Sequence, residues 1–319
     1  MNRRRFMGIM AFVALASAIS CTTTSVRRRL VEVAEEAKIA FDPARDGNME
    51  IYVMNPDGSD QHRLTYTPNG KDSWLPAWSP DRRRISFSSN RDGNWQLYIM
   101  NSDGTNLSQL TNTAGGDNWN TDWSPDGKRI AFDSNRDGGW ELYGMDPDGS
   151  RVRRLTHFVE NREGAGNPDW SPDGTTIVFE VCADPECKDD RIEIHVMNTD
   201  GSNQRQLTRT PDRGSWTPRW SPDGKNIVFS SNRNGASRAP EIYVMDGDGS
   251  QMRRLSERGA RPYWSPDGKS IVFVSNRDCP SQRNEKFNVK CADIYVMRAD
   301  GSHLRRLTHN NEGGGHPAW

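Results

Sequence analysis

WSPDGKRIAFDSNRDG, at Trp123–Gly138, is one copy of a segment that recurs along this 319-residue chain. Most copies continue into an Ile-Tyr-x-Met segment or a close variant, an Asp-Gly turn and a final Leu-Thr pair, as at Leu155-Thr156. The leading Trp falls at Trp78, Trp123, Trp170, Trp220, Trp264 and Trp319, 44 to 55 residues apart. A period of this length, built from several strand-like segments, is typical of the blades of a β-propeller.

Each copy predicts four short strands, which we name a, b, c and d in chain order. Strand a ends at the leading Trp, and Ser-Pro-Asp-Gly turns the chain because Pro presets φ and Gly accepts a positive φ. Strand b carries Ile and Phe two residues apart, as at Ile130 and Phe132, so both side chains lie on one face. Strand c follows, and an Asp-Gly hairpin leads into strand d. We therefore predict an all-β fold.

The two ends of the repetitive part, residues 37–319, complement each other. It begins at Lys38-Ile39-Ala40-Phe41, which matches strand b and has no strand a before it. It ends at His316-Pro317-Ala318-Trp319, which matches strand a and has no turn after it. A ring of blades must close to protect its outer strand edges. We therefore predict a six-bladed propeller of four-stranded blades, in which the C-terminal strand a joins the N-terminal strands b, c and d.

Residues 1–21 have the pattern of an export signal. The basic run Arg3–Arg5 precedes an apolar stretch too short to span a bilayer, and Cys21 follows several small residues, as in a bacterial lipoprotein signal. We expect lipidation of Cys21, then a linker at residues 22–36. Plain secretion is the alternative, and both twin-arginine and general export remain open. The predicted location is the cell envelope, facing the periplasm and on the outer membrane if the cell has one.

Four further cysteines lie in two insertions between strands b and c: Cys182, Cys187, Cys279 and Cys291. An even number of cysteines in an exported protein favours disulfides. We predict the pairs Cys182–Cys187 and Cys279–Cys291, because each pair lies within a single insertion. A zinc site made by all four cysteines is the alternative, but it would require two distant loops to converge without paired C-x-x-C spacing.

The net charge of −1 provides no overall field that would attract nucleic acid or an anionic membrane. We therefore expect no nucleic-acid partner, and membrane contact only through a lipid anchor at Cys21. The sequence contains no Gly-x-Ser-x-Gly elbow, no His-Glu-x-x-His and no phosphate-binding glycine loop. The prediction is a monomeric binding scaffold rather than an enzyme.

The d–a and b–c connections of a propeller lie on one face, and they differ greatly between these copies. Recognition is usually built where loops vary over a rigid frame. Three copies carry an additional Trp four residues before the leading Trp, and polar residues next to the leading Trp should line the channel. The predicted binding residues are Trp74, Trp119, Trp216, Asn120, Asp122, Asn167, Asp169, Arg219, Arg261, Tyr263 and His316.

Two questions about this face stay open at the sequence level. The additional tryptophans could anchor a partner or pack over the neighbouring blade. The mixed-sign polar ring would suit a peptide, a carboxylate or a cation, or it could hold only water; no cofactor is predicted. His157, His309 and His316 lie in d–a connections and could meet above the channel as metal ligands, as a polysaccharide-lyase function would require.

A further recurring sequence, Asn-Arg-Asp-Gly in full or in part, follows strand b in most copies, as at Arg91 and Arg277. Its repetition predicts a structural turn whose Arg contacts a neighbouring blade, rather than a charge site for a ligand.

The Trp-Ser-Pro-Asp-Gly and Ile-Tyr-x-Met-x-x-Asp-Gly segments resemble the repeats of TolB-type propellers over Lys38–Trp319. The resemblance implies a six-bladed propeller in a cell-envelope setting. TolB proteins carry an α/β domain before the propeller and bind the peptidoglycan-associated lipoprotein at its mouth, whereas a short linker stands at that place here. We therefore expect a stand-alone TolB-like propeller that presents the d–a/b–c face and channel mouth to an envelope protein or peptide. Oligogalacturonate lyases have similar repeats, which keeps carbohydrate binding or lyase activity as the alternative.

Overall fold

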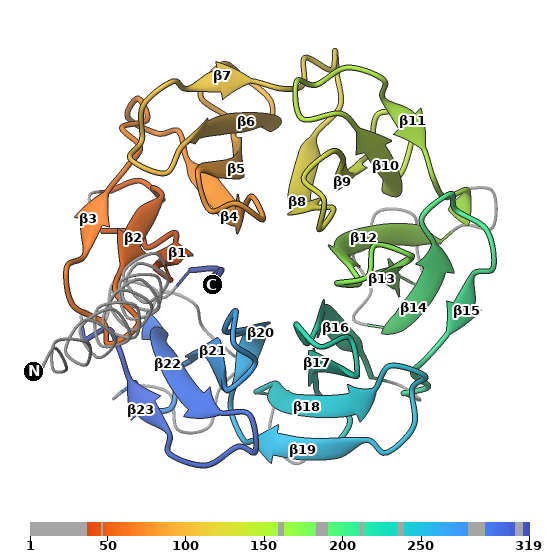
Figure 1. Ribbon diagram of the computed structural model, residues 1–319. Coiled ribbons are helices and arrows are strands. Elements are labelled where there is room, and N and C mark those ends of the chain that lie inside the picture. Colours follow the sequence, from red (N-terminus) through yellow and green to blue (C-terminus); the bar gives the residue numbers. More distant parts are fainter. Residues whose placement is uncertain are drawn as a thin grey trace, which may run out of the picture. The chain divides into compact units, whose positions relative to one another are not determined.

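The computed structural model describes residues 37–45, 47–158, 163–182, 191–210, 213–234, 239–279, 291–309 and 315–319. The predicted export signal, the linker, Cys21 and Cys187 lie outside these residues. Ile39–Trp319 forms one compact unit whose antiparallel sheets surround a central axis (Figure 1). No helix within the described ranges has the length and apolar character needed to cross a membrane.

Each sheet of the ring is one blade, and the blades follow one another in chain order. Blade 1 contains β1 (Ile39–Phe41), β2 (Tyr52–Met54) and β3 (His62–Arg63). Blade 2 contains β4 (Ser73–Trp78), β5 (Arg84–Ser89), β6 (Gln96–Asn101) and β7 (Ser108–Gln109). Blade 3 contains β8 (Asn118–Trp123), β9 (Ile130–Ser134), β10 (Glu141–Met145) and β11 (Arg153–Arg154).

The second half of the ring repeats this arrangement. Blade 4 contains β12 (Gly164–Trp170), β13 (Thr176–Cys182), β14 (Ile192–Asn198) and β15 (Arg205–Gln206). Blade 5 contains β16 (Ser215–Trp220), β17 (Asn226–Ser231), β18 (Glu241–Asp246) and β19 (Arg253–Ser256). Blade 6 contains β20 (Ala260–Trp264), β21 (Ser270–Ser275), β22 (Asp293–Arg298) and β23 (Arg305–Arg306). The predicted all-β, six-bladed fold is confirmed.

The C-terminal segment completes blade 1, as predicted. Ala40 and Ala318 are antiparallel partners, and the backbone N–H of each donates to the carbonyl oxygen of the other at 2.8 Å. Figure 1 shows the C-terminus beside β1. β1 is therefore flanked by β2 on one side and by the C-terminal segment on the other, so the ring is closed by hydrogen bonds within one sheet.

Buried apolar side chains fill the junctions between neighbouring blades. The cluster at the closing junction joins Ile39 and Phe41 of blade 1 to Val272, Ile294 and Leu307 of blade 6. Burying each such side chain contributes about 1.5–3 kcal/mol, and a single blade could not bury it alone. The Phe of strand b is fully buried in every blade: Phe41, Phe87, Phe132, Phe179, Phe229 and Phe273.

The glycine of the recurring Asp-Gly turn sets how closely neighbouring blades approach. Gly149 of blade 3 has a φ of 83°, and a Cβ there would lie 2.3 Å from the carbonyl oxygen of Leu110 in blade 2. Gly201 of blade 4 would meet the carbonyl oxygen of Leu155 in blade 3 at the same distance. The turn therefore closes a hairpin and also lets it lie directly against the preceding blade.

The Arg of the Asn-Arg-Asp-Gly turn has different partners in different blades. The Arg91 guanidinium lies 4.9 Å from the centre of the Tyr98 ring and donates to Ser73 Oγ at 3.1 Å, both in blade 2. Arg277 of blade 6 donates to Ser256 Oγ of blade 5 at 2.9 Å. The predicted contact with a neighbouring blade is thus a hydrogen bond for Arg277. For Arg91 it is an electrostatic interaction with Glu50 of blade 1, while strand a of blade 2 itself offers the hydrogen-bond acceptor.

We expect Ala318→Pro to destabilise the propeller, because proline has no N–H to donate to Ala40. The expected loss is about 3 kcal/mol in the free energy of unfolding, measured by urea unfolding. Ala318→Gly is the matched control: it keeps the N–H and should cost about 1 kcal/mol. Equal stability of the two variants would show that the Ala40–Ala318 pairing does not hold the ring closed.

Candidate functional site

Strand a of each complete blade carries a bulge at the channel wall. In blade 2, Trp74 pairs with Ser88 and Ala77 with Ser86, so two residues of β4 oppose one residue of β5. The residue after the shift has a φ between 41° and 58°, in the left-handed region that non-glycine residues rarely adopt. This residue lines the central cavity in every complete blade: Leu75, Asn120, Asn167, Thr217 and Arg261.

In four of these bulges the backbone N–H donates to a buried side chain of the preceding blade. The Leu75 N–H donates to the Asp42 carboxylate at 2.7 Å, and the Asn167 N–H donates to Asp133 at 3.2 Å. The corresponding pairs in the next two blades are Thr217–Glu180 and Arg261–Ser230. Each acceptor directly follows the buried Phe of strand b, a position that sequence reasoning missed although it is polar in most copies.

Burial raises the pKa of four carboxyl groups in the channel wall. The pKa of Asp133 rises to about 7, and that of Asp169 to about 6, where the Arg219 guanidinium opposes the effect of burial. Burial and then the neighbouring Asp169 charge hold the pKa of Asp122 well above its usual range. Burial also raises the pKa of Glu180. Keeping these carboxyl groups ionised in the wall is therefore costly.

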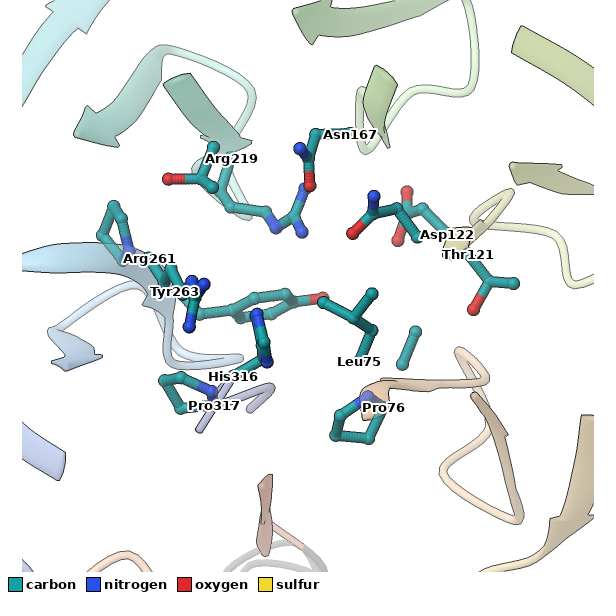
Figure 2. A pocket seen from close by; sticks show the side chains of 14 residues that line it. Leu75, Pro76, Thr121, Asp122, Asn167, Arg219, Arg261, Tyr263, His316 and Pro317 are labelled. Atoms are coloured by element: carbon teal, nitrogen blue, oxygen red, sulfur yellow. The ribbon is translucent and has the colours of Figure 1, made fainter. Parts of the chain in front are cut away.

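Arg219 and Tyr263 occupy the middle of the channel. The Arg219 Nε lies 3.8 Å from an Asp169 carboxylate oxygen, and its guanidinium carbon lies 5.5 Å from the centre of the Tyr263 ring. Figure 2 shows the Tyr263 ring extending across the middle of the cavity. Arg219, Tyr263 and Asp122 line both this cavity and the opening on the hairpin face, where Asp169 also lies.

The opposite opening, which we call the mouth, contains the other predicted residues. Trp74, Trp119 and Trp216 line it. It is continuous with the central cavity, because several residues line both: Leu75, Asn120, Asn167, Thr217, Arg261 and His316. The structure thus places the predicted residues along one channel, from the tryptophans at the mouth to Asp169 at the far opening.

Trp74 and Trp119 belong to a tryptophan cluster that also contains Trp95 and Trp140. The ring centres of Trp74 and Trp119 lie 5.5 Å apart with an interplanar angle of 88°. Trp95 lies 4.9 Å from Trp74 and 5.0 Å from Trp119, and Trp140 lies 6.2 Å from Trp119. All four are half-buried. The additional tryptophans of blades 2 and 3 therefore pack on one another, while Trp216 of blade 5 lines the mouth separately.

Sequence reasoning missed Trp95 and Trp140. Both lie in b–c connections, two residues after an Asn-Arg-Asp-Gly turn, in two successive copies. That repeated placement was the available signal.

His316 links the mouth to the buried carboxylate of Asp42. Its Nδ1 lies 2.8 Å from an Asp42 oxygen, and its ring centre lies 6.3 Å from that of Trp74. Burial and then the Arg261 charge lower the pKa of His316. His157 and His309 are exposed, and the described residues contain no group of three His, Cys, Asp or Glu side chains that could hold a metal ion. The three candidate histidines are thus not brought together as ligands.

The TolB beta propeller domain family matches residues 70–215 and 157–290. The chain belongs to the TolB beta propeller domain family. TolB from Acinetobacter baumannii is similar in structure, with a TM-score of 0.70 and 20% identity over 89% of this chain and 66% of that one. This TolB-type propeller thus spans slightly less than two thirds of the Acinetobacter protein. A search of curated protein sequences finds no match.

Two other solved structures share the propeller fold. Putative TolB from Agrobacterium tumefaciens has a TM-score of 0.63 and 24% identity over 87% of this chain and 90% of that one. An oligogalacturonate lyase in complex with manganese has a TM-score of 0.51 and 15% identity over 84% of this chain and 71% of that one. At these identities the similarity establishes only the fold of the TolB-type propeller, because proteins of one fold can bind different ligands.

A disulfide joins Cys279 and Cys291, with Cα atoms 5.8 Å apart, as predicted. Cys182 is also disulfide-bonded, and its predicted partner lies outside the described residues. Cysteines in disulfides cannot supply the four thiolates that the alternative zinc site requires.

We expect Asp133 to make stability fall as the pH rises from about 4 to about 7. Its pKa is about 7 in the folded protein and near 3.8 otherwise, so in this window the folded state holds a proton that the unfolded state releases. The loss is about 1.4 kcal/mol for each pH unit. The amide that Asp133→Asn introduces is neutral at every pH. The free energy of unfolding of this variant should therefore rise relative to that of the unmodified protein across the window.

Urea unfolding at several pH values measures this difference. Asp148→Asn is the control, because Asp148 is exposed and its pKa is lowered by hydrogen bonds from Ser150, so it stays ionised across the window. An Asp133→Asn profile parallel to that of the unmodified protein would contradict the prediction.

Proposed function

We propose that this propeller is a binding scaffold of the bacterial cell envelope whose mouth receives a segment of a protein or peptide partner. The observation that carries the proposal is the tryptophan cluster at the edge of a charged cavity. Half-buried aromatic side chains beside polar groups are the usual composition of a protein-binding hot spot. Membership of the TolB family is consistent with such a role.

The mouth is held by rigid parts of the molecule. Trp74 and Trp119 stand in strands β4 and β8, each next to a bulge, and the bulge beside Trp74 is bonded to blade 1 through the Leu75 N–H. The Cys279–Cys291 disulfide ties a b–c connection of blade 6. A preorganised surface loses little conformational entropy when a partner binds, which supports recognition by rigid docking.

Carbohydrate binding or lyase activity is less well supported by the same residues. A sugar ring stacks on an open indole face, whereas Trp74 and Trp119 meet edge to face and Trp95 tilts against both. The lyase alternative needs histidines that converge, and His157 and His309 are exposed on different blades. The arrangement therefore favours a protein or peptide over a polysaccharide.

A photo-reactive side chain at the mouth should capture the partner in cells that export the protein. We expect p-benzoylphenylalanine at Trp216, in the mouth, to cross-link one specific envelope protein, and the same group at Pro125, at the far opening, to capture none.

Combining Trp74→Ala with Trp119→Ala should weaken binding by about 30-fold or more. Trp140→Ala is the matched control, because it removes an indole of the same cluster that does not line the mouth.

Equal cross-linking at both positions, or binding that survives loss of Trp74 and Trp119 in a protein of unchanged thermal stability, would contradict the proposal.

We also propose that the mature protein is a monomer anchored by a lipid on Cys21 and tethered through residues 22–36. The pattern of residues 1–21 supports this. Cys21→Ser should abolish labelling with radioactive palmitate and move the protein from the membrane fraction to the soluble one. Membrane association that persists in the Cys21→Ser variant would contradict the anchor without affecting the binding proposal.

A further inference from the structure

Arg261 is a cation that lines the mouth. It lies in the bulge of β20, where its φ is 56°. Its side chain lines both the mouth and the central cavity. Its backbone N–H donates to Ser230 Oγ at 2.9 Å. Within the part of the chain that the structure describes, its guanidinium forms neither a hydrogen bond nor an ion pair. By contrast, Arg219, one blade earlier, is paired with Asp169.

The carboxylates of the channel wall already have donors. Asp42 accepts from the Leu75 N–H and from His316, and Asp133 accepts from Asn120 and Asn167. Glu180 accepts from the Asn167 side chain at 2.9 Å. Among the described residues, the wall thus contains acceptors that already have donors, beside a guanidinium to which the protein offers no acceptor. Arg261 is half-buried, so its guanidinium also meets solvent at the mouth, and its donors are available to an anion that enters there.

The chemistry of the cavity favours a singly charged planar anion. A guanidinium presents parallel N–H groups that match the two oxygens of a carboxylate. Asp42 and Glu180 are close enough to act on the Arg261 charge, although enclosure is the larger effect and lowers the pKa of Arg261. A doubly charged phosphate would be repelled by both carboxylates. Figure 2 shows the nitrogen atoms of Arg261 and His316 directed into the same cavity. A carboxylate bound to Arg261 would therefore lie in the cavity that His316 also lines.

We infer that Arg261 anchors a carboxylate of the bound peptide, either its C-terminus or an Asp or Glu side chain. The inference rests on the proposed function, since the same peptide would place its apolar part against the tryptophan cluster. Trp74 connects the two regions, because it belongs to the cluster and stacks at 6.3 Å on His316. Arg261 would then select the chemistry of the partner while the indoles supply contact area.

Small probes can test the anchor without knowledge of the partner. We would titrate the ¹⁵N-labelled protein with N-acetylglycine, which carries a carboxylate, with N-acetylglycinamide, which is neutral, and with glycinamide, which is a cation, at constant ionic strength. N-acetylglycine alone should shift the indole N–H signals of Trp74 and Trp119 in a saturable manner. Arg261→Gln should weaken this binding by about tenfold or more, since a hydrogen bond to a charged group is lost.

Two variants control this result. Arg261→Lys keeps the charge without the paired donors and should retain part of the affinity. Arg151→Gln removes an exposed arginine, which pairs with Asp146 on a hairpin, and should leave the titration unchanged. Comparing N-acetylglycine with the α-amide of N-acetylaspartate distinguishes a C-terminal from a side-chain carboxylate, and tighter binding of either supports the anchor.

Several outcomes would overturn the inference. Equal shifts with N-acetylglycine and N-acetylglycinamide, preference for glycinamide, or unchanged affinity in Arg261→Gln would each exclude a carboxylate anchor. Tighter binding of galacturonate than of any peptide probe would assign the site to a sugar acid instead. If Trp74→Ala with Trp119→Ala abolishes the cross-link and Arg261→Gln does not, the scaffold stands and the anchor fails.

Discussion

The two hydrogen bonds between Ala40 and Ala318 join the ends of the propeller in one sheet, and the rest of the molecule depends on them. Every blade buries its apolar faces against neighbours on both sides, so an open ring would expose Ile39 and Phe41 at one end and Leu307 at the other. Closure also sets the radius at which the six strand a segments face one another. The mouth exists only in the closed ring, because His316 comes from the C-terminal segment and Trp74 from blade 2.

The bulge of strand a has two roles at once. Its backbone N–H ties blades 2, 4, 5 and 6 to a buried acceptor of the preceding blade, as from Leu75 to Asp42. Because this bond uses the backbone, the side chain at the same position is free to vary without loss of the junction. Along the ring that side chain is Leu75, Asn120, Asn167, Thr217 and Arg261. One repeated frame can thus present a different chemistry from each blade, which explains how a regular repeat holds an irregular site.

The charges of the channel distinguish structural groups from available ones. Asp122 accepts the Trp170 N–H and Asp169 accepts the Trp220 N–H, so both carboxylates join neighbouring blades despite the cost of their burial. Arg219 offsets part of that cost through its ion pair with Asp169. Arg261 has no such partner within the described ranges, and for that reason it, rather than Arg219, is available to a ligand.

The sequence by itself determined the strands, the turns, the number of blades and the closure of the ring, because each of these depends on patterns within one copy or on the match between the two ends. It also predicted the Cys279–Cys291 disulfide, whose partners lie in one insertion. Only the tertiary structure decided which side chains meet across blades, since these contacts depend on the rotation between neighbouring sheets. His316 contacts Asp42, which lies 274 residues away in the sequence. Trp95 contacts both Trp74 and Trp119, which belong to different blades. The same physical reason separates two arginines that look alike in the sequence: the ring brings Asp169 to Arg219 and leaves Arg261 facing the mouth.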